Sequence, residues 1–160
     1  MDVLALRKTS GKIEGDIRLN GHPQEELSFR RCTGYVEQFD VQSAQLTIRE
    51  TLKFSAKLRL QENDPAVTKE SIEKFINQTL AMLELTVIQD LQVGSDEEGG
   101  LSFEQKKRLS IAVELVANPS IIFLDEVRGN LKHVDDSFHN FVSLSLTPFL
   151  LYSPQPTSGL

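Results

Sequence analysis

The chain of 160 residues contains no tryptophan, two tyrosines, two methionines and one cysteine. Because Cys32 is the single cysteine, a disulfide within the chain is excluded, and such sparing use of cysteine fits a reducing compartment. No apolar run approaches the roughly 18 residues that a membrane-spanning helix needs, and the N-terminus has no signal-peptide pattern. We therefore expect no direct membrane span in this chain. Any membrane association has to come through a partner or another part of the polypeptide.

An excess of basic residues is also lacking. Lysine and arginine number 17 against 23 aspartates and glutamates, which gives a net charge of −6 and a pI near 5.1. Domains that bind nucleic acid usually carry a basic face. The short runs Lys106-Lys107-Arg108 and Arg30-Arg31 are too small to provide one, and we interpret both as solvated faces. The composition therefore predicts no nucleic-acid partner.

The most informative segment is LSFEQKKRLSIAVELVANPSIIFLDE, from Leu101 to Glu126. Ser102 and Gln105, three residues apart, form a capping-box pattern at the start of a helix. Apolar residues then recur at helical spacing until Pro119 ends the run. The first amides of such a helix and the hydroxyl of Ser102 point out of its end, where the helix dipole favours an anion.

A short apolar run, Ile121 to Leu124, follows this helix. Its composition predicts a strand buried on both faces of a parallel sheet. Asp125 and Glu126 come directly after it, at the end of the strand where ligands bind in open α/β sheets. One carboxylate at this place can hold Mg²⁺, and a second can orient or deprotonate an attacking water molecule.

Taken together, the segment resembles the signature helix and Walker B strand of an ATP-binding cassette (ABC) nucleotide-binding domain. It is most similar to the degenerate signature of the second cassette in pleiotropic-drug-resistance transporters of subfamily G. The sequence GYVEQFD, Gly34 to Asp40, resembles the Q-loop of that family. Lys12 to Gly21 resembles its early antiparallel strands, and Met1 to Leu6 resembles the end of the helix that follows the Walker A loop.

The resemblance implies an α/β fold: a partial ABC-type P-loop NTPase domain with a mainly parallel core sheet, an antiparallel β part and a helical subdomain. We assign residues 1–126 to this partial domain and about 41–118 to the helical subdomain and signature helix. In that subdomain, Thr47 and Glu50 form a second capping box. An apolar stripe from Ile72 to Leu83 marks a further helix.

Roles for individual residues also follow from the resemblance. Asp125 would hold Mg²⁺ through water, Glu126 would be the catalytic base, and Gln38 would contact Mg²⁺ and sense the γ-phosphate of ATP. Ser102 and Gln105 would belong to the ATP site of the partner cassette. The implied cofactors are ATP and Mg²⁺. The implied partners are a second nucleotide-binding domain and the transmembrane domains of an ABC transporter, which would place the chain at the cytosolic face of a membrane through its parent transporter.

The signature differs from the common L-S-G-G-Q pattern. Phe103 and Glu104 occupy the two glycine positions, where a bulky ring and a carboxylate would oppose close approach of a phosphate and add like charge. The switch histidine of the family cannot be assigned, because no family motif surrounds His133 or His139.

The Walker A pattern G-x-x-x-x-G-K-[ST] does not occur in these residues. Gly11-Lys12 is followed by Ile13, and Leu6 stands where the first glycine should be. Because Met1 already matches the helix behind that loop, we expect the loop and the strand before it to be missing. The chain alone should then hardly bind ATP and should be inactive by itself as an ATPase.

The resemblance stops after Glu126. Family members continue from Leu-Asp-Glu into Pro-Thr-Ser-Gly-Leu, the start of the D-loop, whereas here that motif appears only at residues 156–160. We interpret residues 127–155 as an unrelated insert and a translated intron, because their removal rejoins the motif in frame. The alternative is a genuine family insertion that forms a surface hairpin. We expect the insert to pack poorly against the cassette.

The sequence therefore indicates a fragment of the ATP-binding cassette of an ABC exporter, whose family couples ATP binding and hydrolysis to transport across a membrane. A non-catalytic truncated product is one alternative. A soluble ABC ATPase acting in translation or DNA repair is another, although such proteins usually keep the two glycines of the signature.

Overall fold

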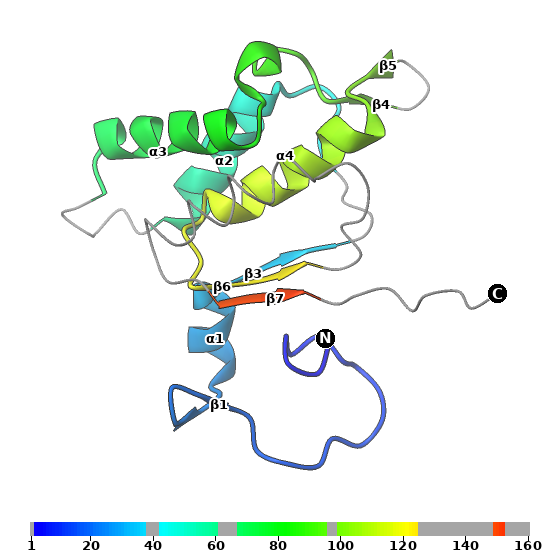
Figure 1. Ribbon diagram of the computed structural model, residues 1–160, viewed down its shortest axis with the longest axis vertical. Helices are drawn as coiled ribbons and strands as arrows, with labels where there is room; N and C mark the ends of the chain where they lie inside the picture. Colours follow the sequence, from blue (N-terminus) through cyan, green and yellow to red (C-terminus); the bar gives the residue numbers. More distant parts are fainter. Residues whose placement is uncertain (1, 38–41, 61–66, 96–98, 125–148, 153–160) are drawn as a thin grey trace.

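The computed structural model describes residues 2–37, 42–60, 67–95, 99–124 and 149–152. All statements below concern those residues. Helices and strands alternate irregularly along the chain (Figure 1). The elements, in order, are β1 (Arg18–Leu19), β2 (His22–Pro23), α1 (Glu26–Cys32), β3 (Thr33–Val36), α2 (Ile48–Arg59), α3 (Lys69–Met82), the 3₁₀ turn η1 (Thr86–Ile88), β4 (Gly94–Ser95), β5 (Gly99–Gly100), α4 (Phe103–Leu115), β6 (Ile121–Leu124) and β7 (Phe149–Tyr152).

The main sheet has the strand order β3-β6-β7, and both of its pairings are parallel. Thr33 pairs with Ile121 and Val36 with Leu124, so β3 and β6 run side by side without offset. Together with the helices, this arrangement confirms the α/β fold and the parallel core sheet expected from the sequence.

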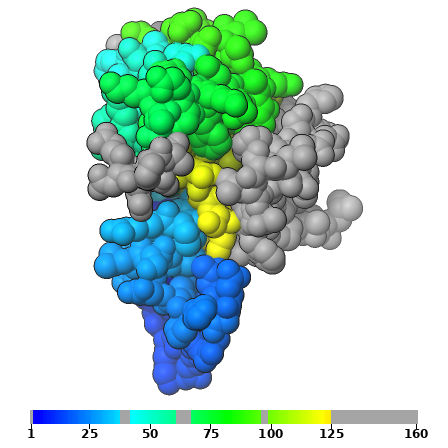
Figure 2. All heavy atoms as spheres, turned by 90° about the vertical axis from the view of Figure 1, so that its left-hand side faces the viewer, coloured from blue at the N-terminus to red at the C-terminus, as the bar shows by residue number. Residues whose placement is uncertain are grey.

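The central strand β6 is buried along its whole length, as its all-apolar sequence predicts. Successive side chains of a strand point to opposite faces. Ile122 and Leu124 pack into the larger core formed with α2, α3 and α4, whereas Ile121 and Phe123 pack into a smaller one on the other face. In Figure 2, residues coloured yellow lie between the helical part and the N-terminal part of the molecule.

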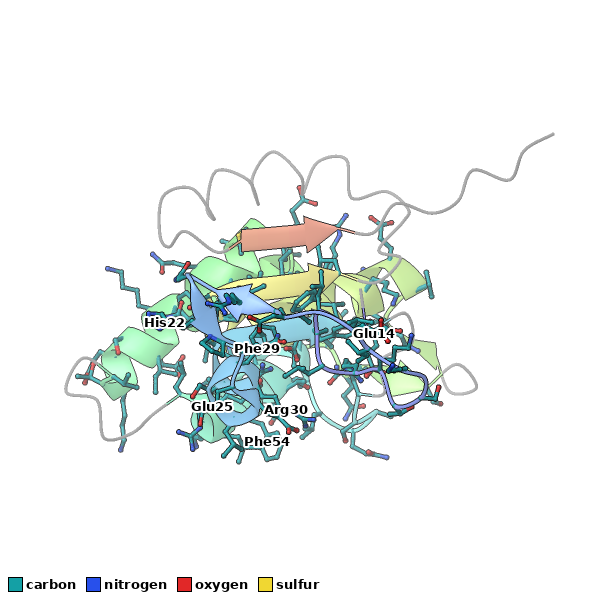
Figure 3. The ribbon with its side chains drawn as sticks, turned by 90° about the horizontal axis from the view of Figure 1, so that it is seen from below. Glu14, His22, Glu25, Phe29, Arg30 and Phe54 are labelled. Carbon is teal, nitrogen blue, oxygen red and sulfur yellow. The ribbon has the colours of Figure 1, made fainter. Side chains whose placement is uncertain are left out.

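The smaller core is aromatic. The rings of Phe29, from α1, and Phe123 have their centroids 6.2 Å apart, and the ring of Tyr35 lies 6.1 Å from that of Phe123. In the view from below, Phe29 lies against the strands (Figure 3). Tilted aromatic pairs at this separation contribute about 0.5 to 1.5 kcal/mol beyond the area that they bury. The second face of the sheet therefore depends on few, large side chains.

The helical layer begins with two capping boxes. Thr47 and Glu50 cap α2, which confirms the prediction, and Thr68 and Ser71 cap α3 in the same way. The hydrogen bonds from the amide and hydroxyl of Thr47 lower the pKa of the Glu50 carboxyl. The predicted apolar stripe of α3 is confirmed as well, because Ile76, Thr79, Leu80 and Leu83 are buried and Ile72 and Phe75 are partly buried.

Ion pairs tie α2 to α3. Glu73 of α3 contacts Lys53 at 2.7 Å and Arg49 at 3.0 Å, both from α2. The hydrogen bond from Lys53 is the main reason why the pKa of Glu73 lies below its ordinary value. The two helices thus form one unit on one side of the sheet.

The antiparallel part is smaller than the sequence suggests. The predicted turn at Asn20-Gly21 is confirmed, with both residues at positive φ (50° and 83°), as a tight hairpin turn requires. It joins β1 and β2, each of two residues, in an antiparallel pair. Lys12 to Ile17 forms no strand, although the carbonyl of Ile17, next to β1, accepts from the N–H of Gln24 at 3.0 Å.

The pairing of β7 differs from expectation. Its four residues fall within 127–155, the segment interpreted above as an insert, and pair in parallel with β6, with Ile121 opposite Phe149 and Leu124 opposite Tyr152. A buried strand has backbone groups on both edges that need partners. The backbone of these four residues is thus paired, whereas the expectation of poor packing concerns apolar side chains, which lie outside what the structure describes here. The remaining residues of the insert, and residues 156–160, lie outside the described residues.

None of the helices in the described ranges is long and apolar enough to cross a membrane.

The C-terminal end of α4 provides a stability test. Asn118 has a φ of 54°, in the left-handed region, and its N–H donates to the carbonyl of Leu115 at 2.8 Å. Glycine adopts this conformation freely and asparagine tolerates it, but a Cβ-bearing apolar residue pays about 1 to 2 kcal/mol. We predict that Asn118→Ala lowers the free energy of unfolding by about 1 kcal/mol, whereas Asn118→Gly leaves it nearly unchanged. Urea denaturation measures both. Equal stability of the alanine variant and the unaltered chain would contradict the assigned cap.

Candidate nucleotide site

The carboxyl ends of β3 and β6 lie next to each other at one end of the sheet. Val36 and Leu124 are paired partners, so the chain leaves both strands at the same place. In an open parallel sheet, ligands bind beyond the carboxyl ends of the strands. Gln38 follows β3 by two residues, and Asp125 and Glu126 follow β6 directly, but all three lie outside the described residues. What the structure gives is the adjacent, in-register pairing of the strands that lead to them.

The start of α4 has the predicted capping box. The hydroxyl of Ser102 accepts from the N–H of Gln105 at 3.3 Å, and the side-chain oxygen of Gln105 accepts from the N–H of Ser102 at 2.9 Å. The amides of Phe103 and Glu104, in the first turn, have no carbonyl of their own helix to bind. The hydroxyl of Ser102 can still donate its proton. This helix end therefore offers donors suited to one anionic oxygen or phosphate group.

The helix α4 runs antiparallel to the strands. Figure 1 shows its start and the carboxyl ends of β3 and β6 on the same side of the molecule, with the helix above the sheet. Among the described residues, no hydrogen bond joins Ser102 or Gln105 to either strand. The start of the helix and the strand ends thus face the same side, and Lys107, one turn into α4, reaches the carbonyl of Glu37 just after β3.

Two carboxylates share one guanidinium at the start of α4. Glu104 accepts from Arg108 at 2.6 Å, and Arg108 also contacts Glu84 at 2.8 Å. One guanidinium thus faces two carboxylates, so the expectation that Glu104 adds like charge near a phosphate is not contradicted and stays a prediction. The ring of Phe103 was expected to oppose close approach of a phosphate, and it is accessible for that, since Phe103 is 67% exposed.

The interpretation of Lys106-Lys107-Arg108 as a solvated face is wrong for two of the three residues. The side chain of Arg108 is only 16% exposed. Lys107 donates to the backbone carbonyl of Glu37 at 2.9 Å. Composition cannot reveal these contacts, because the elements they join are far apart in the sequence.

Sequence reasoning also missed Glu114, near the end of α4. Its carboxylate accepts from the N–H of Tyr35 at 3.1 Å and from both terminal nitrogens of Arg59, at 2.8 and 2.9 Å. Lys107 and Glu114 are seven residues apart, which places them on one face of a helix. That spacing was the only signal in the sequence.

The expected magnesium ligands, Asp125 and Gln38, lie outside the described residues. Within the described ranges, no group of three or more His, Cys, Asp or Glu side chains could hold a metal ion. The described residues therefore supply donors for an anion at the start of α4, and the strand pairing that leads toward the predicted metal ligands.

Comparison with known proteins agrees with this arrangement. The profile of the family described as ABC transporter matches residues 3–128 of the chain. The chain belongs to the ABC transporter family. It is 53% identical over 131 residues to ABC transporter G family member 31 of Arabidopsis thaliana, and likewise to member 51 of Oryza sativa subsp. japonica. It is 54% identical over 126 residues to member 37 of Arabidopsis thaliana.

The ABC match covers 82% of this chain for members 31 and 51, but only 9% of the length of either relative. For member 37 the shares are 79% and 8%. The chain thus corresponds to less than a tenth of these G family transporters. That portion falls within the ATP-binding domain of the family.

The capping role of Ser102 can be separated from any role toward a ligand. We predict that Ser102→Ala lowers the free energy of unfolding by about 1 kcal/mol, since it removes the acceptor for the Gln105 amide, whereas Ser102→Thr retains most of it. Ser120→Ala, at an exposed serine with no such bond, is the matched control. Thermal and urea denaturation of the chain measure the effect. A Ser102→Ala variant as stable as the control would mean that the cap contributes nothing.

Proposed function

We propose that this segment is part of the ATP-hydrolysing cassette of an ABC exporter, in which ATP binding and hydrolysis drive transport across a membrane. One observation carries the proposal: β6 is fully buried, pairs in register with β3, and leads directly into Asp125-Glu126. The family match over residues 3–128 supports it. Phosphoryl transfer needs accurate positioning of charged groups more than covalent chemistry, and a strand fixed on both faces provides a rigid base for them.

Each carboxylate after β6 has a separate role in this proposal. Asp125 would hold Mg²⁺, and Glu126 would take a proton from the attacking water molecule. Gln38, after β3, would contact Mg²⁺ and the same water. The metal ion, when bound, neutralises the charge that develops on the phosphate oxygens.

The start of α4 serves a different site. We assign Ser102 and Gln105 to the ATP site of a partner cassette, as the resemblance of the signature segment implies. The first-turn donors of α4 point out of the helix end, where they are open to such a ligand. Phe103, exposed at the first helical position, limits how closely a phosphate can approach. The proposed site at this helix end is therefore a weak one, as a degenerate signature implies.

Partners and location follow from this assignment. A second nucleotide-binding domain and the transmembrane domains of the same transporter are the proposed partners, and they hold the cassette at the cytosolic face of a membrane. The net charge of −6 opposes a role with nucleic acid.

A second candidate is a non-catalytic product. The observation that favours it is the lack of a G-x-x-x-x-G-K-[ST] pattern in residues 1–160. These residues alone therefore provide no Walker A loop to bind phosphates.

The catalytic assignment is tested by Glu126→Gln in a transporter that contains this segment together with a complete phosphate-binding loop. Removal of a general base should lower kcat by about 10²-fold to 10⁴-fold. The affinity for Mg-ATP should change little, because Asp125 remains. Glu70→Gln, at an exposed glutamate of α3, is the matched control. Steady-state hydrolysis and nucleotide-binding measurements give the result, and equal turnover of variant and unaltered transporter would remove Glu126 from the mechanism.

We also propose that residues 127–155 are a translated intron. The family match ends at residue 128, and the motif PTSGL, expected directly after Glu126, stands at residues 156–160. Val127-Arg128 can be encoded by a sequence that begins as a splice donor does, and Gln155 by CAG, which ends as an acceptor does. The pyrimidine-rich codons available for Phe149 to Pro154 suit the tract before an acceptor.

Amplification of the transcript across this point tests the proposal. We predict that mature messages include a product shorter by the coding length of residues 127–155, in which Glu126 joins directly to Pro156. If every mature message keeps the intervening sequence, the segment is a genuine insertion instead.

A further inference from the structure

The outer edge of β3 has no neighbouring strand among the described residues, since the order of the sheet is β3-β6-β7. An edge strand presents N–H and C=O groups that need other partners. In a strand, the backbone groups of residues two apart point to the same edge. The N–H of Tyr35 and the carbonyl of Glu37 therefore belong to the same, outer edge of this chain segment.

Two side chains of α4 bind these two backbone groups. The carboxylate of Glu114 accepts from Tyr35 N–H at 3.1 Å, and Nζ of Lys107 donates to the carbonyl of Glu37 at 2.9 Å. An acceptor thus meets the strand's donor and a donor meets its acceptor, as a neighbouring strand would arrange them. Both bonds involve a charged group, which makes them stronger than bonds between neutral groups. We call these four groups the edge clamp.

The carboxylate in the edge clamp is itself fixed. Arg59, from α2, binds both oxygens of Glu114, and the side chains of the pair are 32% and 19% exposed. Gly34 leaves room for the carboxylate, because a Cβ at that position would lie 3.0 Å from Oε2 of Glu114. Three elements, α2, α4 and β3, therefore meet at a single side chain whose orientation is set from two sides.

We propose that Lys107 and Glu114 are positioning residues, which hold the outer edge of β3 on α4 and so fix the place where the chain leaves the sheet. Glu37 is the last residue before Gln38, so the clamp acts on the segment that carries this proposed contact to Mg²⁺. Its effect on catalysis rests on the proposed function. Because Ser102 caps the same helix that carries Lys107 and Glu114, the clamp also fixes the start of α4 relative to the end of β3.

The first test uses the 160-residue chain and needs no ATP. Glu114→Ala should speed hydrogen exchange of the Tyr35 amide about fivefold to tenfold, because that N–H loses its acceptor. Glu114→Gln keeps an acceptor oxygen and should retain most of the protection. Glu70→Gln is the control outside the clamp. Unchanged exchange at Tyr35 in Glu114→Ala would overturn the clamp.

The second test measures ATP hydrolysis by a transporter that contains this segment. Lys107→Met keeps the aliphatic stem but removes the donor. It should lower kcat about tenfold, with the KM for ATP within about twofold, because a misplaced group affects the transition state more than binding. Lys107→Arg should restore most of the turnover, and Lys57→Met, at an exposed lysine of α2, should have no effect.

The outcomes of the second test are distinct. If Lys107→Met lowers the amount of folded transporter but leaves kcat per folded molecule unchanged, the residue is merely structural and the positioning role is wrong. If the unaltered transporter hydrolyses no ATP, the proposed function fails, and the exchange of the Tyr35 amide alone then decides whether the edge clamp exists.

Discussion

The burial of β6 on both of its faces is the constraint on which the rest of this structure depends. Four consecutive apolar residues, Ile121 to Leu124, can all be buried in one strand only if a separate layer covers each face of that strand. The helices α2, α3 and α4 supply one layer, and a small aromatic cluster around Phe29 and Phe123 supplies the other. Full burial of each large apolar side chain contributes about 1.5 to 3 kcal/mol, so the strand cannot shift by one residue without losing most of that contribution.

A strand held in this way fixes the residues that follow it. Because β6 pairs in register with β3, the two strands end side by side. The chain then continues from β6 into Asp125-Glu126 and from β3 toward Gln38. The helix α4 packs over the same strands and binds the outer edge of β3 through Lys107 and Glu114. Fold and proposed chemistry are thus connected through a few backbone groups at the carboxyl end of the sheet.

The parts that the sequence predicted well are those set by local patterns. The capping boxes at Ser102 and Thr47, the turn at Asn20-Gly21 and the buried strand after Pro119 depend on residues within a few positions of one another, and the structure confirms each. Family resemblance added the α/β fold and the parallel sheet.

The failures concern contacts between distant segments. Lys107 and Arg108 look like a solvated basic run in the sequence, but Glu37 lies 70 residues from Lys107 in the chain and supplies its partner carbonyl. Arg108 likewise pairs with Glu84, 24 residues away in the chain, in addition to Glu104 one turn earlier in the same helix. The pairing of β7 with β6 also could not be predicted. Backbone hydrogen bonds between strands do not depend on the side chains, so the sequence does not show which segment pairs with the open edge of β6.

Native-state hydrogen exchange of the 160-residue chain tests the central claim most directly. If β6 is held between two apolar layers, the amides of residues 121–124 should exchange only when the whole domain unfolds, and they should be among the slowest in the chain. The amides of β1 and β2 should exchange much faster through local opening. Exchange of the β6 amides at the rate of an unfolded peptide, or no slower than that of β1 and β2, would contradict the account.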